Sequence, residues 1–130
     1  MKKSKITAAI VKESSGYSIT ASVGKHFIAS EGETFDELKS GFMEAVNLAL
    51  KNTGFTYTFQ DVTMNYDLES FFNFYKVLNA KALSERIGMN QSLLAQYIKG
   101  IKKPSAVQVK RIMEGVHQIG RELSEARFLI

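Results

Sequence analysis

The sequence contains no cysteine, no tryptophan and a single proline among its 130 residues. Without cysteine the chain cannot form disulfides, thiolate zinc ligands or a thiol nucleophile. No apolar run approaches the ~18–20 residues that a membrane-spanning helix requires. The segment after Met1-Lys2-Lys3 alternates polar and apolar residues and lacks the apolar core of a signal peptide. These absences predict a cytosolic, cytoplasmic protein.

The overall composition is that of a folded protein, with 45% hydrophobic and 23% charged residues. The length allows one ordinary domain or two small ones. Modules of about 60 residues are marginally stable alone, so two of them are expected to pack together or to dimerise.

Positive charge is concentrated in the second half of the chain. Residues 1–78 hold 8 Lys/Arg and 9 Asp/Glu, a net charge of −1, whereas residues 79–130 hold 9 Lys/Arg and 4 Asp/Glu, a net charge of +5. A near-neutral half joined to a basic half suggests two functions, one of them facing a polyanion. A solvated basic surface without a ligand is the alternative.

The first half alternates apolar and polar residues in the manner of β-strands. The expected strands are Ile6–Val11, Tyr17–Val23, Lys25–Ala29 and a fourth over Phe55–Phe59. A capping box at Thr34 and Glu37 predicts a helix that ends near Gly54, between the third and fourth strands. The segment before it, Glu31-Gly32, is expected to break the sheet. The pattern predicts a β-β-β-α-β module.

Little in this module indicates catalysis. His26 lacks an acid or nucleophile partner and is expected to be a surface or structural residue. The acidic residues around the helix start are favoured there by the helix dipole, which is a simpler reason than metal binding; they are Glu31, Glu33, Asp36 and Glu37. The aromatic residues at 55, 57 and 59 are expected to pack under the helix rather than to stack nucleobases. We expect no enzyme activity, no metal and no cofactor.

The second half reads as a series of short helices separated by helix-capping residues. Asp67 caps the first helix and Asn79 opens the second, which ends at Gly88. Asn90 or Gln91 begins the third. A basic loop, residues 101–104, leads to a fourth helix that begins after Ser105. Four side chains of this helix are expected to face the core: Val109, Ile112, Val116 and Ile119.

This spacing suits a helix-turn-helix motif. Two short helices are locked across a glycine turn by apolar residues, and the small Ser84 lies where the helices approach each other. The third helix then exposes polar residues that suit base edges and phosphates. The candidate DNA-binding residues are Asn90, Gln91, Ser92, Ala95, Gln96, Lys99, Lys102 and Lys103. An unrelated helical bundle is the alternative.

The stretch Leu83–Ser92, followed by Gly100–Ser105, resembles the Xre/Cro-repressor family of helix-turn-helix domains. The resemblance implies that the third helix enters the major groove, with Gln91 and Ser92 at positions that touch bases or phosphates. One departure is Ala80, which stands where many members carry a phosphate-binding Gln. Ala95 likewise stands where a polar residue is common.

The first half resembles HicB-type antitoxins through its first strand, its hairpin at Gly16-Tyr17 and the helix entry at 31–38. The resemblance implies an α+β fold: a partial RNase H-like module over residues 1–62 and an all-α helix-turn-helix domain of four to five helices over residues 63–130. Such a nuclease fold needs clustered carboxylates for metal, and Ile6–Val11 contains none.

The two resemblances together imply an antitoxin of a type II toxin-antitoxin pair. It would neutralise a small basic HicA-type RNA-cleaving toxin through the acidic residues 31–37 and a sheet edge, and repress its own operon as a homodimer or higher homo-oligomer on double-stranded operator DNA. The apolar end Phe128-Leu129-Ile130 is expected at a dimer contact or against the first domain. The alternative is a stand-alone repressor whose first module senses a ligand or dimerises.

Overall fold

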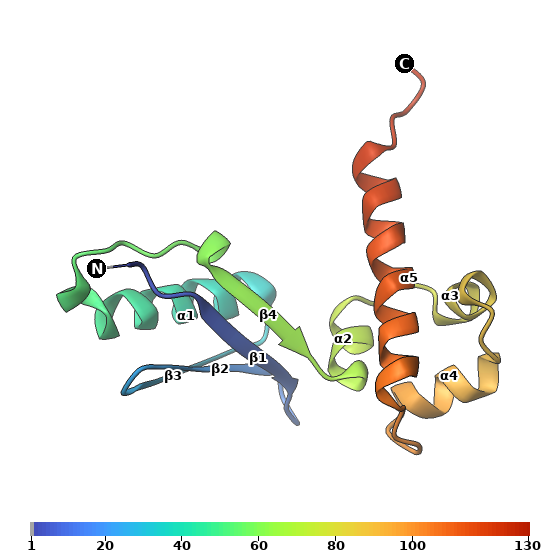
Figure 1. The fold of residues 1–130 in the computed structure, drawn as a ribbon, viewed down its shortest axis with the longest axis horizontal. Coiled ribbons are helices and arrows are strands. Elements are labelled where there is room, and N and C mark those ends of the chain that lie inside the picture. Colours follow the sequence, from blue (N-terminus) through green and yellow to red (C-terminus); the bar gives the residue numbers. More distant parts are fainter. Residues whose placement is uncertain (1) are drawn as a thin grey trace. The chain divides into compact units, whose positions relative to one another are not determined.

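The computed structural model describes residues 2–130, and the chain forms two compact units, one ending at Phe74 and one spanning Tyr75–Ile130. The first unit contains a four-stranded mixed sheet, and four helices follow its last strand (Figure 1). The predicted α+β class is therefore confirmed. The two units divide after Phe74, whereas the sequence placed the division after residue 62.

The sheet has the order β3-β2-β1-β4. Its strands are β1 (Ile6–Lys12), β2 (Tyr17–Val23), β3 (His26–Gly32) and β4 (Val62–Tyr66). The first three pair antiparallel, and β4 pairs parallel to β1. We expected the third strand to end at Ala29, but the β2–β3 ladder continues through Ser18 opposite Glu31 and Tyr17 opposite Gly32. Glu31-Gly32 therefore belongs to the strand rather than breaking it.

Helix α1 (Phe35–Ala49) covers one face of this sheet (Figure 1). It begins as predicted, because the Thr34 hydroxyl accepts a hydrogen bond from the Glu37 amide at 3.1 Å. The Glu37 carboxylate accepts a hydrogen bond from the backbone amide of Glu33 at 3.1 Å, whereas a capping box would have it accept from the amide of Thr34. The core between α1 and the sheet is the buried set Ile6, Ala8, Ile10, Ile19, Ala21, Val23, Ile28, Leu38, Phe42, Val46, Leu50 and Tyr57.

The predicted strand over Phe55–Phe59 is absent, and the strand that completes the sheet begins at Val62. A 3-10 turn (Lys51–Thr53) and the left-handed Gly54 end the helical stretch, as expected. The chain then runs without strand pairing to a second 3-10 turn (Phe59–Asp61). Tyr57 is buried in the core, so this aromatic segment packs under α1 even though it forms no strand.

Helix α2 (Leu68–Phe74) begins at the predicted cap, since Asp67 accepts a hydrogen bond from the Ser70 amide at 2.7 Å. It packs against β1 of the first unit. The Ser70 hydroxyl accepts a hydrogen bond from the Lys12 amide at 2.9 Å, and Tyr17 donates one to Asn73 at 2.6 Å. Because of these contacts, the first unit extends beyond β4 and includes α2 as far as Phe74.

The second unit is built from α3 (Ala80–Ile87), α4 (Gln91–Ile98) and α5 (Ala106–Glu125). Ile112 is buried and Val116 and Ile119 are partly buried, as expected, but Val109 is 38% exposed and does not point inward. The last three side chains, Phe128 to Ile130, are at least 95% exposed. Over residues 2–130, none of the helices combines the length and apolar character that spanning a bilayer demands.

Candidate functional site

A tight turn joins α3 to α4. Gly88 ends α3 in the left-handed conformation with φ 68°, which only glycine adopts without strain. The amide of Met89 donates to the carbonyl oxygen of Ser84 at 2.9 Å, and the Met89 side chain is buried. Asn90 then caps α4 by accepting a hydrogen bond from the Leu93 amide at 3.2 Å. The two helices are thus joined by three residues of fixed geometry, Gly88, Met89 and Asn90.

The angle of α4 is fixed by a small apolar core that α3, α4 and α5 share. Leu83, Leu94 and Ile112 are each less than 4% exposed. Ser84 is buried beside them, as predicted for the point of closest approach, and its hydroxyl donates to the carbonyl oxygen of Lys81 at 2.6 Å. Gly115 of α5 makes room for α3, because a Cβ there would overlap Cγ2 of Ile87.

Two of the basic residues of this unit have structural partners. The Arg111 guanidinium donates to the carbonyl oxygens of Ile87 at 2.8 Å and Gly88 at 3.2 Å, which satisfies the end of α3. Arg86 forms a two-point ion pair with Glu122 at 2.7 and 2.9 Å. The hydrogen bond from Arg86 lowers the pKa of Glu122 and correspondingly raises the pKa of Arg86. The distribution of charge along the sequence does not reveal that these two arginines have structural partners.

The predicted polar residues lie at the exposed beginning of α4 and on the side of the helix away from the buried Leu94. Gln91, Ser92 and Lys99 are exposed, and Ala95 and Gln96 are partly exposed beside them. The side-chain oxygen of Asn90 accepts the capping hydrogen bond, which leaves the NH2 group of that side chain for a ligand. This face therefore offers amide, hydroxyl and ammonium groups around a small alanine.

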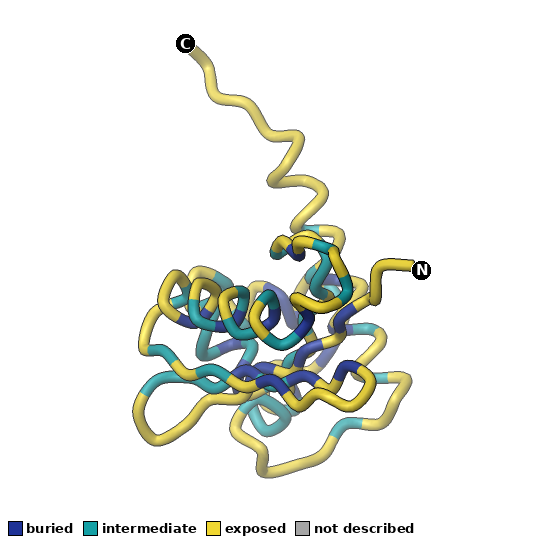
Figure 2. Tube along the Cα trace, turned by 90° about the vertical axis from the view of Figure 1, so that its left-hand side faces the viewer, coloured by how far each residue is buried: buried dark blue, intermediate teal, exposed yellow. Residues whose placement is uncertain are grey.

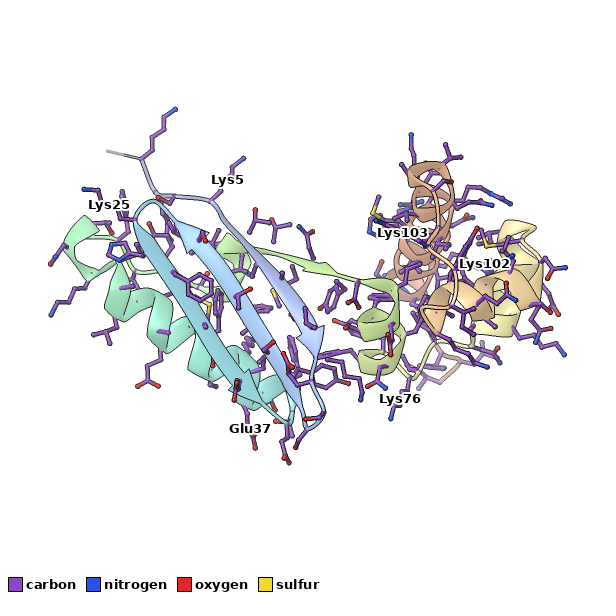
Figure 3. All side chains as sticks on the ribbon, turned by 90° about the horizontal axis from the view of Figure 1, so that it is seen from below. Lys5, Lys25, Glu37, Lys76, Lys102 and Lys103 are labelled. Atoms are coloured by element: carbon purple, nitrogen blue, oxygen red, sulfur yellow. The ribbon has the colours of Figure 1, made fainter. Side chains whose placement is uncertain are left out.

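The loop after α4 holds two exposed lysines next to that face. Gly100 reverses the chain with φ 76°, and the amides of Ile101 and Lys102 donate to the carbonyl oxygen of Gln96 at 2.9 and 3.3 Å. Lys102 and Lys103 follow this turn directly, and both lie in the loop before α5 (Figure 3). Backbone hydrogen bonds thus fix the position of the lysines relative to α4.

The predicted acidic residues of the first unit lie together where β3 leads into α1. Glu31, Glu33, Asp36 and Glu37 are all exposed, and Figure 3 labels Glu37 at this end. Glu33 accepts a hydrogen bond from Ser15 at 3.1 Å, which connects the group to the β1–β2 turn. That turn contributes a fifth carboxylate, Glu13, which accepts from Ser18 at 2.7 Å. Sequence reasoning missed Glu13 because the hairpin alone brings it here.

His26 lies at the opposite end of β3 and is exposed. Within the part of the chain from residue 2 to 130, no three His, Asp or Glu side chains are grouped so that they would hold a metal ion. Comparison of the chain with models of protein families, with curated proteins and with solved structures gives no match.

Proposed function

We propose that this chain is a transcriptional repressor that binds operator DNA through a helix-turn-helix formed by α3 and α4. The observation that carries the proposal is the turn at Gly88, which holds α4 on α3 with one polar face exposed. A helix with free amide and hydroxyl groups suits the major groove, where Gln and Asn pair with adenine. Lys102 and Lys103 suit the sugar-phosphate backbone beside it.

A selection from a randomised duplex library with the full chain tests this proposal. We expect enrichment of a short motif, because side chains on a rigid helix read base edges. The variant Ala95→Glu places a carboxylate on the exposed face of α4 and should abolish enrichment. The matched control Leu48→Glu adds the same charge at an exposed position of α1 and should preserve it. Failure to enrich any motif would contradict the proposal.

We further propose that the first unit neutralises a small basic toxin, so that the whole protein is a HicB-type antitoxin. The supporting observation is the acidic surface formed by Glu13, Glu31, Glu33, Asp36 and Glu37. It adjoins β3, an edge strand whose outer backbone groups have no neighbouring strand in the sheet. Carboxylates around an open edge suit a basic partner and speed its encounter.

Purification of the tagged chain from its host, followed by a toxicity-rescue assay of any small basic partner, tests the second proposal. The double variant Glu33→Lys/Asp36→Lys should release the partner and lose rescue. Glu44→Lys changes an exposed glutamate farther along α1 and should retain both. A partner bound equally well by both variants would contradict the acidic surface. Ligand-dependent release of DNA without any protein partner would favour the stand-alone repressor.

A further inference from the structure

All four arginines of the sequence lie outside α4 and the loop that follows it. Arg86 is paired with Glu122, and Arg111 donates to the carbonyl oxygens at the end of α3. Arg121 and Arg127 belong to the last turns of α5 and the segment beyond it, which Figure 2 shows as exposed. Figure 1 shows α4 beside the beginning of α5, at the opposite end of that helix. The proposed recognition helix therefore lacks the side chain that most often bonds guanine.

Asn90 and Gln91 both stand at the beginning of α4, where a recognition helix meets base edges. A two-point bond to adenine needs a side-chain oxygen that accepts from N6 and an NH2 group that donates to N7. The capping bond holds the oxygen of Asn90 at the Leu93 amide, 3.2 Å away, so this side chain presents its NH2 group. Gln91 is exposed, and within residues 2–130 its side chain forms no hydrogen bond. Gln91 therefore presents both groups that adenine requires.

Ala95 places a methyl group in the middle of this polar face. Gln91 and Ser92 lie one helical turn before it, and Lys99 lies one turn after it. Ala95 is partly exposed and offers no donor or acceptor. A polar base edge placed against it would lose water without gaining a partner. The apolar group that bases present in the major groove is the 5-methyl group of thymine, which suits this position.

The spacing along α4 separates these contacts from the phosphate contacts. Four residues of helix advance by about 6 Å, and successive base pairs lie about 3.4 Å apart. The contact at Ala95 therefore falls within about two base pairs of the contact at Gln91. Lys99 ends α4 next to the loop that holds Lys102 and Lys103, so it suits the sugar-phosphate backbone rather than a guanine.

From these observations we infer that Ala95 contacts the 5-methyl group of a thymine close to an adenine that Gln91 bonds, so that the recognised core of the operator consists of A·T pairs. The inference rests on the proposed DNA binding and names the bases that α4 selects. Because cytosine and both purines lack this methyl group, Ala95 determines specificity at that base pair.

Deoxyuridine, which is thymidine without the 5-methyl group, tests the contact directly. The duplex obtained from the library selection is synthesised with deoxyuridine in place of each thymidine in turn, and the affinity of the full chain is measured by fluorescence anisotropy. We expect at least one position where the replacement weakens wild-type binding roughly threefold to fivefold, as the loss of one buried methyl group does. Ala95→Gly should bind the two duplexes with affinities within about twofold of each other, because the partner of the methyl group is gone.

Ala82→Gly is the matched control, because Ala82 is an exposed alanine of α3 and its replacement has a similar cost in helix propensity. It should retain the wild-type ratio of the two affinities, so that a ratio lost only in Ala95→Gly does not arise from weakened folding. Insensitivity to deoxyuridine at every thymidine would overturn the thymine contact while leaving DNA binding intact. A wild-type ratio in Ala95→Gly, or a selected motif built of G·C pairs, would do the same. Enrichment of no motif would overturn the contact and the proposed DNA binding together.

Discussion

Asn47 of α1 forms hydrogen bonds with both backbone groups of Tyr57. Its amide nitrogen donates to the Tyr57 carbonyl oxygen at 3.0 Å, and its side-chain oxygen accepts from the Tyr57 amide at 2.7 Å. A β-ladder satisfies the same two groups in a strand. One asparagine therefore replaces a neighbouring strand for this residue and holds the 55–59 segment beneath α1.

We expect Asn47→Ala to lower the stability of the first unit by about 2 kcal/mol, because both Tyr57 backbone groups would lose a partner in a buried setting. Native-state hydrogen exchange at the amides of Ile10 and Ile19 reports on this unit alone. Asn52→Ala, in the exposed 3-10 turn, is the control and should have little effect on exchange. Equal acceleration in the two variants would show that the asparagine bridge contributes little.

Sequence predicted the beginnings of the helices well, because capping is decided within a few residues. Thr34, Asn79, Asn90 and Ser105 each accept a hydrogen bond from the amide three residues later. Each is a residue type whose short polar side chain favours this position. The same local logic correctly placed Gly88 at the end of α3. The helical frame of the candidate DNA-binding site was therefore predictable.

Features that depend on distant contacts were not predictable from local patterns. Alternation of aromatic and polar residues at 55–59 is typical of a strand, but here hydrogen bonds from Asn47, ten residues earlier, take the place of strand pairing at Tyr57. The division after Phe74 depends on Tyr17 and Lys12 contacting α2 across more than fifty residues. The role of Arg111 at the end of α3 likewise follows from the approach of α5.

The two glycines of α5 should respond oppositely to alanine. Gly115→Ala should destabilise the second unit by about 1–3 kcal/mol, because the added Cβ overlaps Ile87. Gly120→Ala should stabilise it by up to about 1 kcal/mol, since alanine favours helix and the site is open. Hydrogen exchange of the Leu83 and Leu94 amides checks both. Changes of the same sign would contradict this packing.

The ion pair between Arg86 and Glu122 makes stability depend on pH in a defined direction. The bond from Arg86 holds the pKa of Glu122 below its usual value of 4.5. Its contribution is therefore fully present above that usual pKa and is lost as the pH falls through the lower folded pKa. Glu122→Gln should lower stability near neutral pH, and the difference from wild type should vanish in acid. Glu85→Gln, an exposed glutamate of α3, is the control; thermal melts across the acid range provide the measurement.

Gln91→Ala tests whether the beginning of α4 reads bases. We expect it to cost about 1–3 kcal/mol on the selected motif and little on random duplex, because a lost base contact affects only the matching sequence. Fluorescence anisotropy with both duplexes, for wild type and variant, separates the two effects. Equal weakening on the two duplexes would assign Gln91 to the backbone or to folding instead of to base readout.

Lys103→Ala tests whether the loop after α4 contacts phosphates, which is a contact independent of base sequence. A lysine that neutralises one phosphate releases counterions on any sequence, so its loss should weaken motif and random duplex alike. The slope of the logarithm of affinity against the logarithm of salt concentration should then fall by about one. Lys51→Ala removes an equally exposed lysine from the first unit and should leave the slope unchanged. An unchanged slope in Lys103→Ala would place the phosphate path elsewhere, and Lys102 and Lys99 would be the next positions to replace.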